Sequence, residues 1–307
     1  MLNYHCPDFY SFQSGYDILF NLYQNKPQCF YPNVKIGVIY GCFPGCIWNG
    51  GGFNFTFPSA DYNTIYQYFH WYSDKDVTLQ LTFTNPTLQE TDVYDRYGNA
   101  ILEAASHYPN IEVLVSVDCL EKYIREMYPM IKVNKSIIAT TRDRDTEEDC
   151  LEKYIENLNN YNKIVLPKKY SKNKEFLSSI PKEYRNRFEI LATDPCPIFC
   201  PNLFHHYEEI GYIQSYQKIN EGQCACSIIP EDNPFRHWMY RSHRLSYEEL
   251  NDFYDKEGFS EIKISGRGTY VYVALQLVPY LIKPEYQKDI YCILLEYYTN
   301  IPVPTSF

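Results

Sequence analysis

The sequence predicts an α/β protein built on a parallel sheet. Short apolar, β-branched runs recur at intervals of roughly 25–35 residues and alternate with amphipathic segments, which is the pattern of repeated βαβ units. The chain has 307 residues and a hydrophobic fraction of 45%, enough for one large domain. No Gly-x-Gly-x-x-Gly or Gly-x4-Gly-Lys-Ser/Thr motif occurs, which argues against a nucleotide-binding open sheet. A (β/α)8-like (TIM-type) barrel, allowing for one irregular or missing strand unit, fits best, and an open doubly wound sheet is second.

Each strand of this barrel is predicted from an apolar run that ends at a turn-forming or polar residue. The seven predicted strands are residues 35–41, 77–84, 111–116, 131–139, 163–167, 187–194 and 261–265. An eighth strand can lie within 213–245. The helices predicted between and after them are residues 59–72, 88–106, 119–127, 146–157, 173–177, 246–257, 269–281 and 285–299.

These elements divide the chain into three parts. Residues 1–34 show no clear hydrophobic period, and we predict a helical or irregular lead-in segment. Residues 35–283 form the predicted barrel, with a Cys-rich insertion at about 213–245. Residues 284–307 form a C-terminal helix and a Pro-rich tail.

Charge and composition narrow the class of protein. The formal net charge of −10 argues against a broad nucleic-acid-binding face, because neutralising phosphates needs clustered Lys and Arg. There is no N-terminal signal pattern and no apolar run of about twenty residues that could span a bilayer. We therefore expect a cytoplasmic protein with no membrane contact. In that reducing compartment its 11 cysteines are buried apolar residues, metal ligands or catalytic groups.

The stretch after the sixth predicted strand carries soft metal ligands. In parallel α/β folds, sites are built where strands end. The candidate ligands are Cys196, Cys200, Cys224, Cys226 and His205. Four thiolates suffice for a [4Fe–4S] cluster, whereas thiolates with an imidazole also satisfy tetrahedral zinc. The spacing alone does not distinguish an iron–sulfur site from a zinc site. The alternative without a metal is that these cysteines are small buried packing residues.

Three charged residues near the strand ends are catalytic candidates. Asp194 beside the cysteines and Glu189 within the strand are candidates for proton transfer. Glu189 alternates with Phe188 and Ile190, which predicts that it points into the barrel. Arg267 directly follows the last predicted strand, where a cation can face a substrate or a cluster.

Other polar residues also follow the ends of predicted strands, and fewer features of the sequence support a role for them in the site. Cys42 and Cys46 follow the first predicted strand and are a second ligand pair, a resolving dithiol or loop-packing residues. Asn85 ends the second predicted strand. Arg142 and Arg144 can hold an anion, although a solvated charged loop is the plainer interpretation.

Three segments of the chain resemble a known family. They are FEILATDPCPIFC at 188–200, EELNDFYDKEGFSEIKISGR at 248–267 and KIVLPKKYS at 163–171. In the second segment, Lys263, Ile264, Gly266 and Arg267 are similar to the family's Lys-Ile-x-Gly-Arg signature. The chain thereby resembles, as a distant relative, the collagenase-like peptidase family (peptidase family U-32), whose members are iron–sulfur TIM-barrel proteins.

The resemblance implies an iron–sulfur-dependent enzyme that runs redox or hydroxylation-type chemistry on a small molecule, an RNA base or a peptide. It favours a [4Fe–4S] cluster over zinc at the cysteines. Two alternatives stay open. One is a metal-dependent hydrolase or peptidase, although no Ser–His–Asp order or His-Glu-x-x-His motif is present. The other is a non-enzymatic partner subunit with a structural metal site, bound to another protein or to a second copy of itself.

Overall fold

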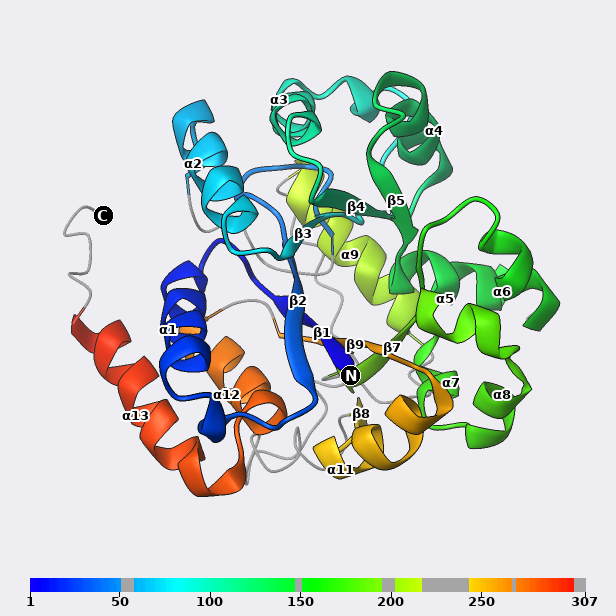
Figure 1. Cartoon of the computed structure of the whole chain (residues 1–307). Helices are drawn as coiled ribbons and strands as arrows, with labels where there is room; N and C mark the ends of the chain where they lie inside the picture. Colours follow the sequence, from blue (N-terminus) through cyan, green and yellow to red (C-terminus); the bar gives the residue numbers. More distant parts are fainter. Residues whose placement is uncertain (51–57, 147–150, 195–201, 217–242, 267–268, 301–307) are drawn as a thin grey trace.

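The structure is a computed structural model that describes residues 1–50, 58–146, 151–194, 202–216, 243–266 and 269–300. Eight parallel strands pair in the order β6-β5-β4-β3-β2-β1-β9-β7, and a further pairing between β6 and β7 closes the barrel. Helices surround the barrel (Figure 1). The eight barrel strands are β1 (Leu2–Pro7), β2 (Val34–Gly41), β3 (Thr78–Phe83), β4 (Ile111–Val115), β5 (Lys132–Lys135), β6 (Ile164–Val165), β7 (Phe188–Asp194) and β9 (Glu261–Ile264). The predicted TIM-type barrel is confirmed.

The first barrel strand comes from the segment that the sequence predicts to be helical or irregular. β1 pairs in parallel with β2 on one side and with β9 on the other, so it closes the ring between the first and last parts of the chain. Strands buried on both faces usually read as continuous apolar runs. In β1, Asn3 and His5 point inward and interrupt that run. The barrel therefore has no missing strand unit.

Two further predictions need correction. The predicted strand 131–139 ends early, because Ser136 Oγ accepts a hydrogen bond from the Ala139 amide at 3.2 Å and helix α5 (Ile137–Thr146) begins there. The strand found within 213–245 is β8 (His243–Arg244), which runs antiparallel to the end of β7 and lies outside the barrel ring. Residues 217–242 of that stretch lie outside the described part of the chain.

The helices fill the intervals between strands. In chain order they are α1 (Gln13–Asn25), η1 (Pro27–Cys29), α2 (Tyr62–Ser73), η2 (Asp92–Tyr94), α3 (Arg96–Ser106), α4 (Asp118–Met127), α5, α6 (Leu151–Asn157), α7 (Lys168–Ser171), α8 (Lys174–Ser179), η3 (Lys182–Arg187), α9 (Leu203–Tyr216), α11 (Tyr247–Glu249), η5 (Leu250–Asp255), α12 (Tyr270–Leu281) and α13 (Pro284–Asn300). None of these helices is long and apolar enough to cross a membrane within the residues described.

The apolar core lies between the outer faces of the strands and the helices. Along β3, for example, Leu79, Leu81 and Phe83 alternate with polar residues and belong to this core. The same alternation sends Gln80 and Thr82 into the barrel. The interior of the barrel is therefore chemically distinct from the core around it.

Candidate functional site

The barrel interior contains a ring of polar side chains towards its N-terminal end. Bulky branched residues usually fill this space. We name the following set the lumen ring: His5, Gln80, Glu112, Lys163, Glu189, Glu261 and Lys263. These residues come from β1, β3, β4, β7, β9 and the residue before β6, so the closure of the barrel assembles the ring.

Glu189 has two cationic neighbours in the ring. Its Oε2 accepts a hydrogen bond from Lys263 Nζ at 3.1 Å. The same oxygen lies 3.3 Å from His5 Nδ1, an ion-pair contact that does not have the geometry of a hydrogen bond. His5 Nε2 then lies 2.7 Å from Glu261 Oε2. His5 thus bridges two carboxylates from different strands.

The remaining members complete the ring. Gln80 Oε1 accepts from Lys263 Nζ at 3.0 Å, and Gln80 Nε2 donates to Glu112 Oε1 at 3.0 Å. Lys163 Nζ donates to Glu261 Oε2. By formal charge the ring contains three carboxylates and two ammonium groups, and a proton on His5 would balance them.

The pKa shifts agree with that charge state. Burial raises the pKa of the Glu189 carboxyl, but His5 and Lys263 lower it more, so it lies well below its usual range. Burial also raises the pKa of Glu261, and His5 and Lys163 outweigh this and lower it to about 2. Burial lowers the pKa of His5, whereas Glu189 and Glu261 raise it more, so it lies above its usual value.

The members of the lumen ring differ in their access to solvent. The side chains of His5 and Glu189 are 0% exposed, whereas Lys163 at 18% and Glu261 at 11% reach solvent at the N-terminal ends of their strands. Glu189 points into the barrel, as strand alternation predicts. Because it is fully paired and stays ionised, its geometry favours a structural role over proton transfer.

The opposite end of the barrel holds a second buried ion pair. Asp194 is the last residue of β7, and its Oδ1 lies 2.9 Å from Lys168 Nζ. The two side chains are 10% and 1% exposed. Asp194 therefore lies where the sequence predicts it, at the C-terminal mouth of the barrel. Lys168 is a partner that the sequence reasoning missed, although it follows its own strand just as Asp194 ends β7.

The short strand β8, some fifty residues further along the chain, pairs with the end of β7. Residues His243 and Arg244 of β8 pair with Asp194 and Thr193 of β7. Arg244 Nη2 donates to Gln276 Oε1 of α12 at 3.0 Å, which ties β8 to the outer helices. The mouth is thus framed by β7, β8 and the residues that follow β6.

The predicted ligand cysteines and Arg267 lie outside the described residues. These are Cys196, Cys200, Cys224, Cys226 and Arg267. The described residues that flank the first cysteine pair are Asp194 and Asn202, and those that flank the second pair are Tyr216 and His243. Asp194 and His243 pair with each other, so both cysteine segments connect to the same end of the barrel. Across the described ranges, no three His, Cys, Asp or Glu side chains form a group that could hold a metal ion.

The histidines of α9 differ in their surroundings. His205 is 70% exposed and faces Glu208 and Glu209 of its own helix at 3.6 and 3.5 Å. His206 is half-buried, and its Nδ1 is buried with no hydrogen-bond partner in the part of the chain that the structure describes. The sequence could not separate the two, because they are adjacent.

Cys42 and Cys46 are both buried in the segment that follows β2. Phe43 and Cys46 close a tight turn through a backbone hydrogen bond of 3.4 Å, and Gly45 within it has φ +80, a conformation that favours glycine. Burial and the neighbouring Cys42 thiol raise the pKa of Cys46 well above its usual value. A protonated, buried thiol is unreactive, so the geometry favours packing residues.

Arg142 is also engaged within the fold. Its Nη1 donates to the Ser116 carbonyl at 3.1 Å, and its Nη2 lies 3.5 Å from Asp118. These contacts support the plainer interpretation of this arginine.

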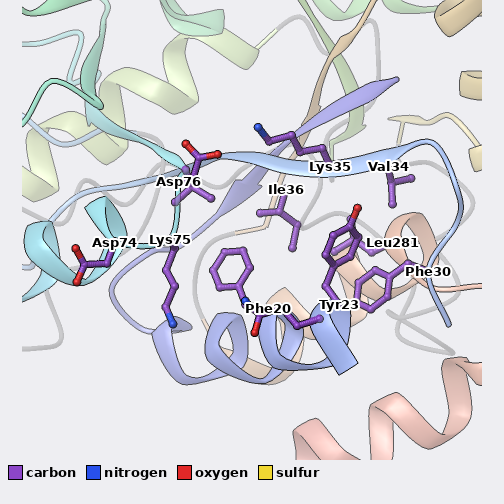
Figure 2. Close-up of a pocket in the computed structure, with 12 residues that line it drawn as sticks. Phe20, Tyr23, Phe30, Val34, Lys35, Ile36, Asp74, Lys75, Asp76 and Leu281 are labelled. Carbon is purple, nitrogen blue, oxygen red and sulfur yellow. The ribbon is translucent and has the colours of Figure 1, made fainter. Parts of the chain in front are cut away.

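A pocket of about 430 Å³ opens at the other end of the molecule. It lies beside the N-terminal end of β2, and Figure 2 shows Ile36 of that strand near Phe20 and Tyr23 of α1. Lys75 and Asp76, from the turn before β3, lie at its rim. None of the predicted site residues lines this pocket.

Comparisons with known proteins add one similarity in fold. No family model matches the chain, and no curated protein gives a significant match. Among solved structures, the chain is similar to the U32 peptidase Mk0906 with a TM-score of 0.49 and 14% sequence identity. The match covers 87% of this chain and 94% of that one. At this identity the likeness concerns the fold, which the strand pairings define independently.

Proposed function

We propose that this chain is an iron–sulfur-dependent TIM-barrel enzyme of the U-32 type with its reaction centre at the C-terminal mouth. The observation that carries the proposal is the buried Lys168–Asp194 pair, which lies at the end of β7 two residues before Cys196. Barrel enzymes place their chemistry at this end. In this role the Asp194 carboxylate would accept or return a proton at the mouth, with Lys168 Nζ as its hydrogen-bond donor.

The donor set fits an iron–sulfur cluster. Cys196, Cys200, Cys224 and Cys226 supply four thiols, and one described residue flanking each pair, Asp194 and His243, pairs with the other across β7 and β8. A bound [4Fe–4S] cluster would supply electron transfer. Lys168 would orient Asp194 through their hydrogen bond, and Arg267 would bind an anionic part of the substrate.

The substrate class follows from the resemblance described for the sequence. Redox or hydroxylation-type chemistry on a small molecule, an RNA base or a peptide is consistent with a polar mouth. The acidic net charge of −10 makes a small molecule or a peptide the better fit than an extended RNA. A cytoplasmic location would keep the thiols reduced.

Metal and sulfide analysis after anaerobic purification tests the proposal, with an absorbance spectrum taken alongside. The expected result is about four iron and four sulfide per chain, with absorbance near 400 nm. One zinc without sulfide would replace the cluster by a zinc site and favour the hydrolase or partner-subunit alternatives. A metal-free protein would overturn the proposed site.

A matched pair of cysteine variants locates the metal. Cys196→Ser should lose most of the iron, because it removes one of four ligands. Cys292→Ser changes an exposed cysteine of α13 and should keep it. Equal iron content in both variants would contradict the ligand assignment.

A further inference from the structure

The pocket of about 430 Å³ lies away from the mouth, beside the N-terminal ends of β2 and β3. Its walls come from the last turns of α1, the first residues of β2, the turn before β3 and the last residue of α12. A pocket of this volume is large enough for a small organic molecule. None of its lining residues belongs to the lumen ring, so it is a separate feature of the molecule.

The start of β2 is less covered than the rest of the strand. Ile39 is fully buried, whereas Ile36 is only half-buried. Figure 2 shows Ile36 pointing towards Phe20 of α1. Phe20, Tyr23 and Gln24 are spaced i, i+3 and i+4, so they lie on one face of α1 and form the wall opposite β2.

Most of the lining is apolar, and part of it is aromatic. Phe30, Val34, Val77 and Leu281 are buried. The ring of Phe30 packs edge-on against Tyr23, with centroids 5.0 Å apart and an interplanar angle of 84°. Tyr23 is nevertheless 47% exposed, so much of its ring is available for a further contact. Aromatic rings prefer edge-on or offset-stacked neighbours, and the lining therefore suits a flat aromatic body.

Lys75 supplies a positive charge at one end of the pocket. In Figure 2 its side chain extends towards α1, whereas the carboxylates of Asp74 and Asp76 point away from the aromatic wall. Lys75 Nζ lies 3.7 Å from Asp17 Oδ1 and 4.9 Å from the centroid of the Trp71 ring. The Asp17 side chain is 49% exposed, and ion pairs of this kind contribute little to stability. A carboxylate on a bound molecule can therefore replace Asp17 as the partner of Lys75.

We propose that this pocket binds a small aromatic carboxylate. The ring system lies between Ile36 on one side and Phe20 and Tyr23 on the other, and the carboxylate accepts a hydrogen bond from Lys75 Nζ. Charge complementarity at Lys75 favours an anion, and the apolar lining favours a body without further polar groups. The inference goes beyond the proposed function and does not rest on it, because the pocket lies apart from the mouth.

The test titrates two matched probes into the full chain by isothermal calorimetry. Naphthalene carboxylate should bind saturably, with one molecule per chain. Naphthylmethylammonium has the same ring system and the opposite charge, and it should bind at least about 10-fold more weakly, because it cannot accept a hydrogen bond from Lys75.

Two variants locate the probe in the pocket. Lys75→Met keeps the apolar stem and removes the charge, so it should weaken carboxylate binding about 10-fold. Tyr23→Ala removes an exposed part of the wall and should weaken the binding of both probes. Lys122→Met, at an exposed lysine of α4, and Tyr62→Ala, at a 55% exposed tyrosine of α2, are the matched controls and should bind as wild type does.

Each other outcome contradicts the inference. A carboxylate probe that does not bind saturably overturns it. Equal affinity in wild type and Lys75→Met would mean that the carboxylate does not contact Lys75, and tighter binding of the ammonium probe would overturn the anionic class. If Lys75→Met does not fold, unchanged binding in Tyr23→Ala is sufficient to overturn the site.

Discussion

The two ends of the barrel interior handle polar groups in opposite ways. In the lumen ring the charged groups of His5, Lys163, Lys263, Glu189 and Glu261 each have an oppositely charged neighbour, and Glu112 accepts a hydrogen bond from Gln80. The side chains of His5 and Glu189 have no access to solvent. At the mouth, Ser116 Oγ and Gln214 Oε1 are buried yet make no hydrogen bond within the described part of the chain. Ion pairs between buried groups hold the strands of the ring together, whereas unused hydrogen-bonding capacity at the mouth is what a ligand can use. The difference agrees with the proposed function, which assigns the reaction centre to the mouth.

Removing a ring carboxylate should have the largest effect on stability. Glu189→Ala leaves Lys263 and His5 without their shared counter-ion in a buried site, which typically costs about 3–5 kcal/mol. Urea denaturation measures the loss. Glu183→Ala, at an exposed acidic residue of η3, should change stability by less than about 0.5 kcal/mol. Similar losses for both variants would mean that the ring does not stabilise the barrel.

The ring should also give stability a characteristic pH dependence, smaller than the loss of Glu189. The raised pKa of His5 contributes stability that is complete below its usual value of 6.5 and disappears as pH rises through the folded value. The lowered pKa of Glu261 contributes stability above its usual value of 4.5 that is lost as pH falls towards about 2. The urea midpoint of unfolding should therefore be highest between about pH 4.5, the usual pKa of a glutamate, and about pH 6.5, the usual pKa of a histidine.

Two histidine variants isolate the alkaline part of this dependence. His5→Gln should remove the decline in stability above neutral pH. His107→Gln, at a histidine that is 59% exposed, should keep the decline. A decline that persists in His5→Gln would assign it to other groups.

A glycine next to the ring should show a moderate effect. A Cβ atom at Gly37 would lie 1.6 Å from Asn3 Oδ1, so Gly37→Ala must displace a side chain that donates to Glu261 at 3.1 Å. We expect a cost of about 1–3 kcal/mol. In an Asn3→Ala background the cost should fall, and a double-mutant cycle of urea midpoints measures this coupling. Purely additive effects would contradict the contact.

At the mouth, Lys168→Met should cost less than the change at Glu189. It removes the more buried partner and leaves Asp194, which is 10% exposed, with solvent access. The expected loss is about 1–2 kcal/mol, accompanied by a loss of activity once a substrate is known. A stability loss as large as that of Glu189→Ala would remove the distinction between the two ends.

The smallest effect is expected at His205. Its ring is 70% exposed and its partners lie on the same helix, so His205→Ala should change stability by at most about 0.5 kcal/mol. Because it faces solvent, we also expect unchanged metal content by elemental analysis. Loss of metal in this variant would make His205 a ligand.

Much of the fold was predictable because most strands show an apolar run. The run at 163–167 contains β6, and 261–265 contains β9, since their outward residues pack against helices. β1 was not predicted as a strand, because its inward residues are polar. These residues belong to the lumen ring or contact it. The early end of β5 was signalled by Ser136, a helix-capping residue within an otherwise apolar segment.

The site was predictable only where one strand end sufficed to place a residue. Asp194 follows from the end of β7 alone. The Lys168–Asp194 contact needs the β6–β7 neighbourhood, and the bonds of Asn85 to Gly211 join residues separated by 126 positions. Which helix contacts Asn85 depends on tertiary packing that no local pattern specifies.

The position of β1 between β2 and β9 also determines when the barrel can close during synthesis. β1 leaves the ribosome before the other barrel strands, but one of its two neighbours, β9, ends at Ile264. At typical elongation rates of about 5–20 residues per second, roughly 10–50 seconds separate the two strands. During that interval one edge of β1 has no native partner, and His5 does not yet contact both Glu189 and Glu261. The barrel therefore closes late in synthesis, and the buried ion pairs of the lumen ring form only then.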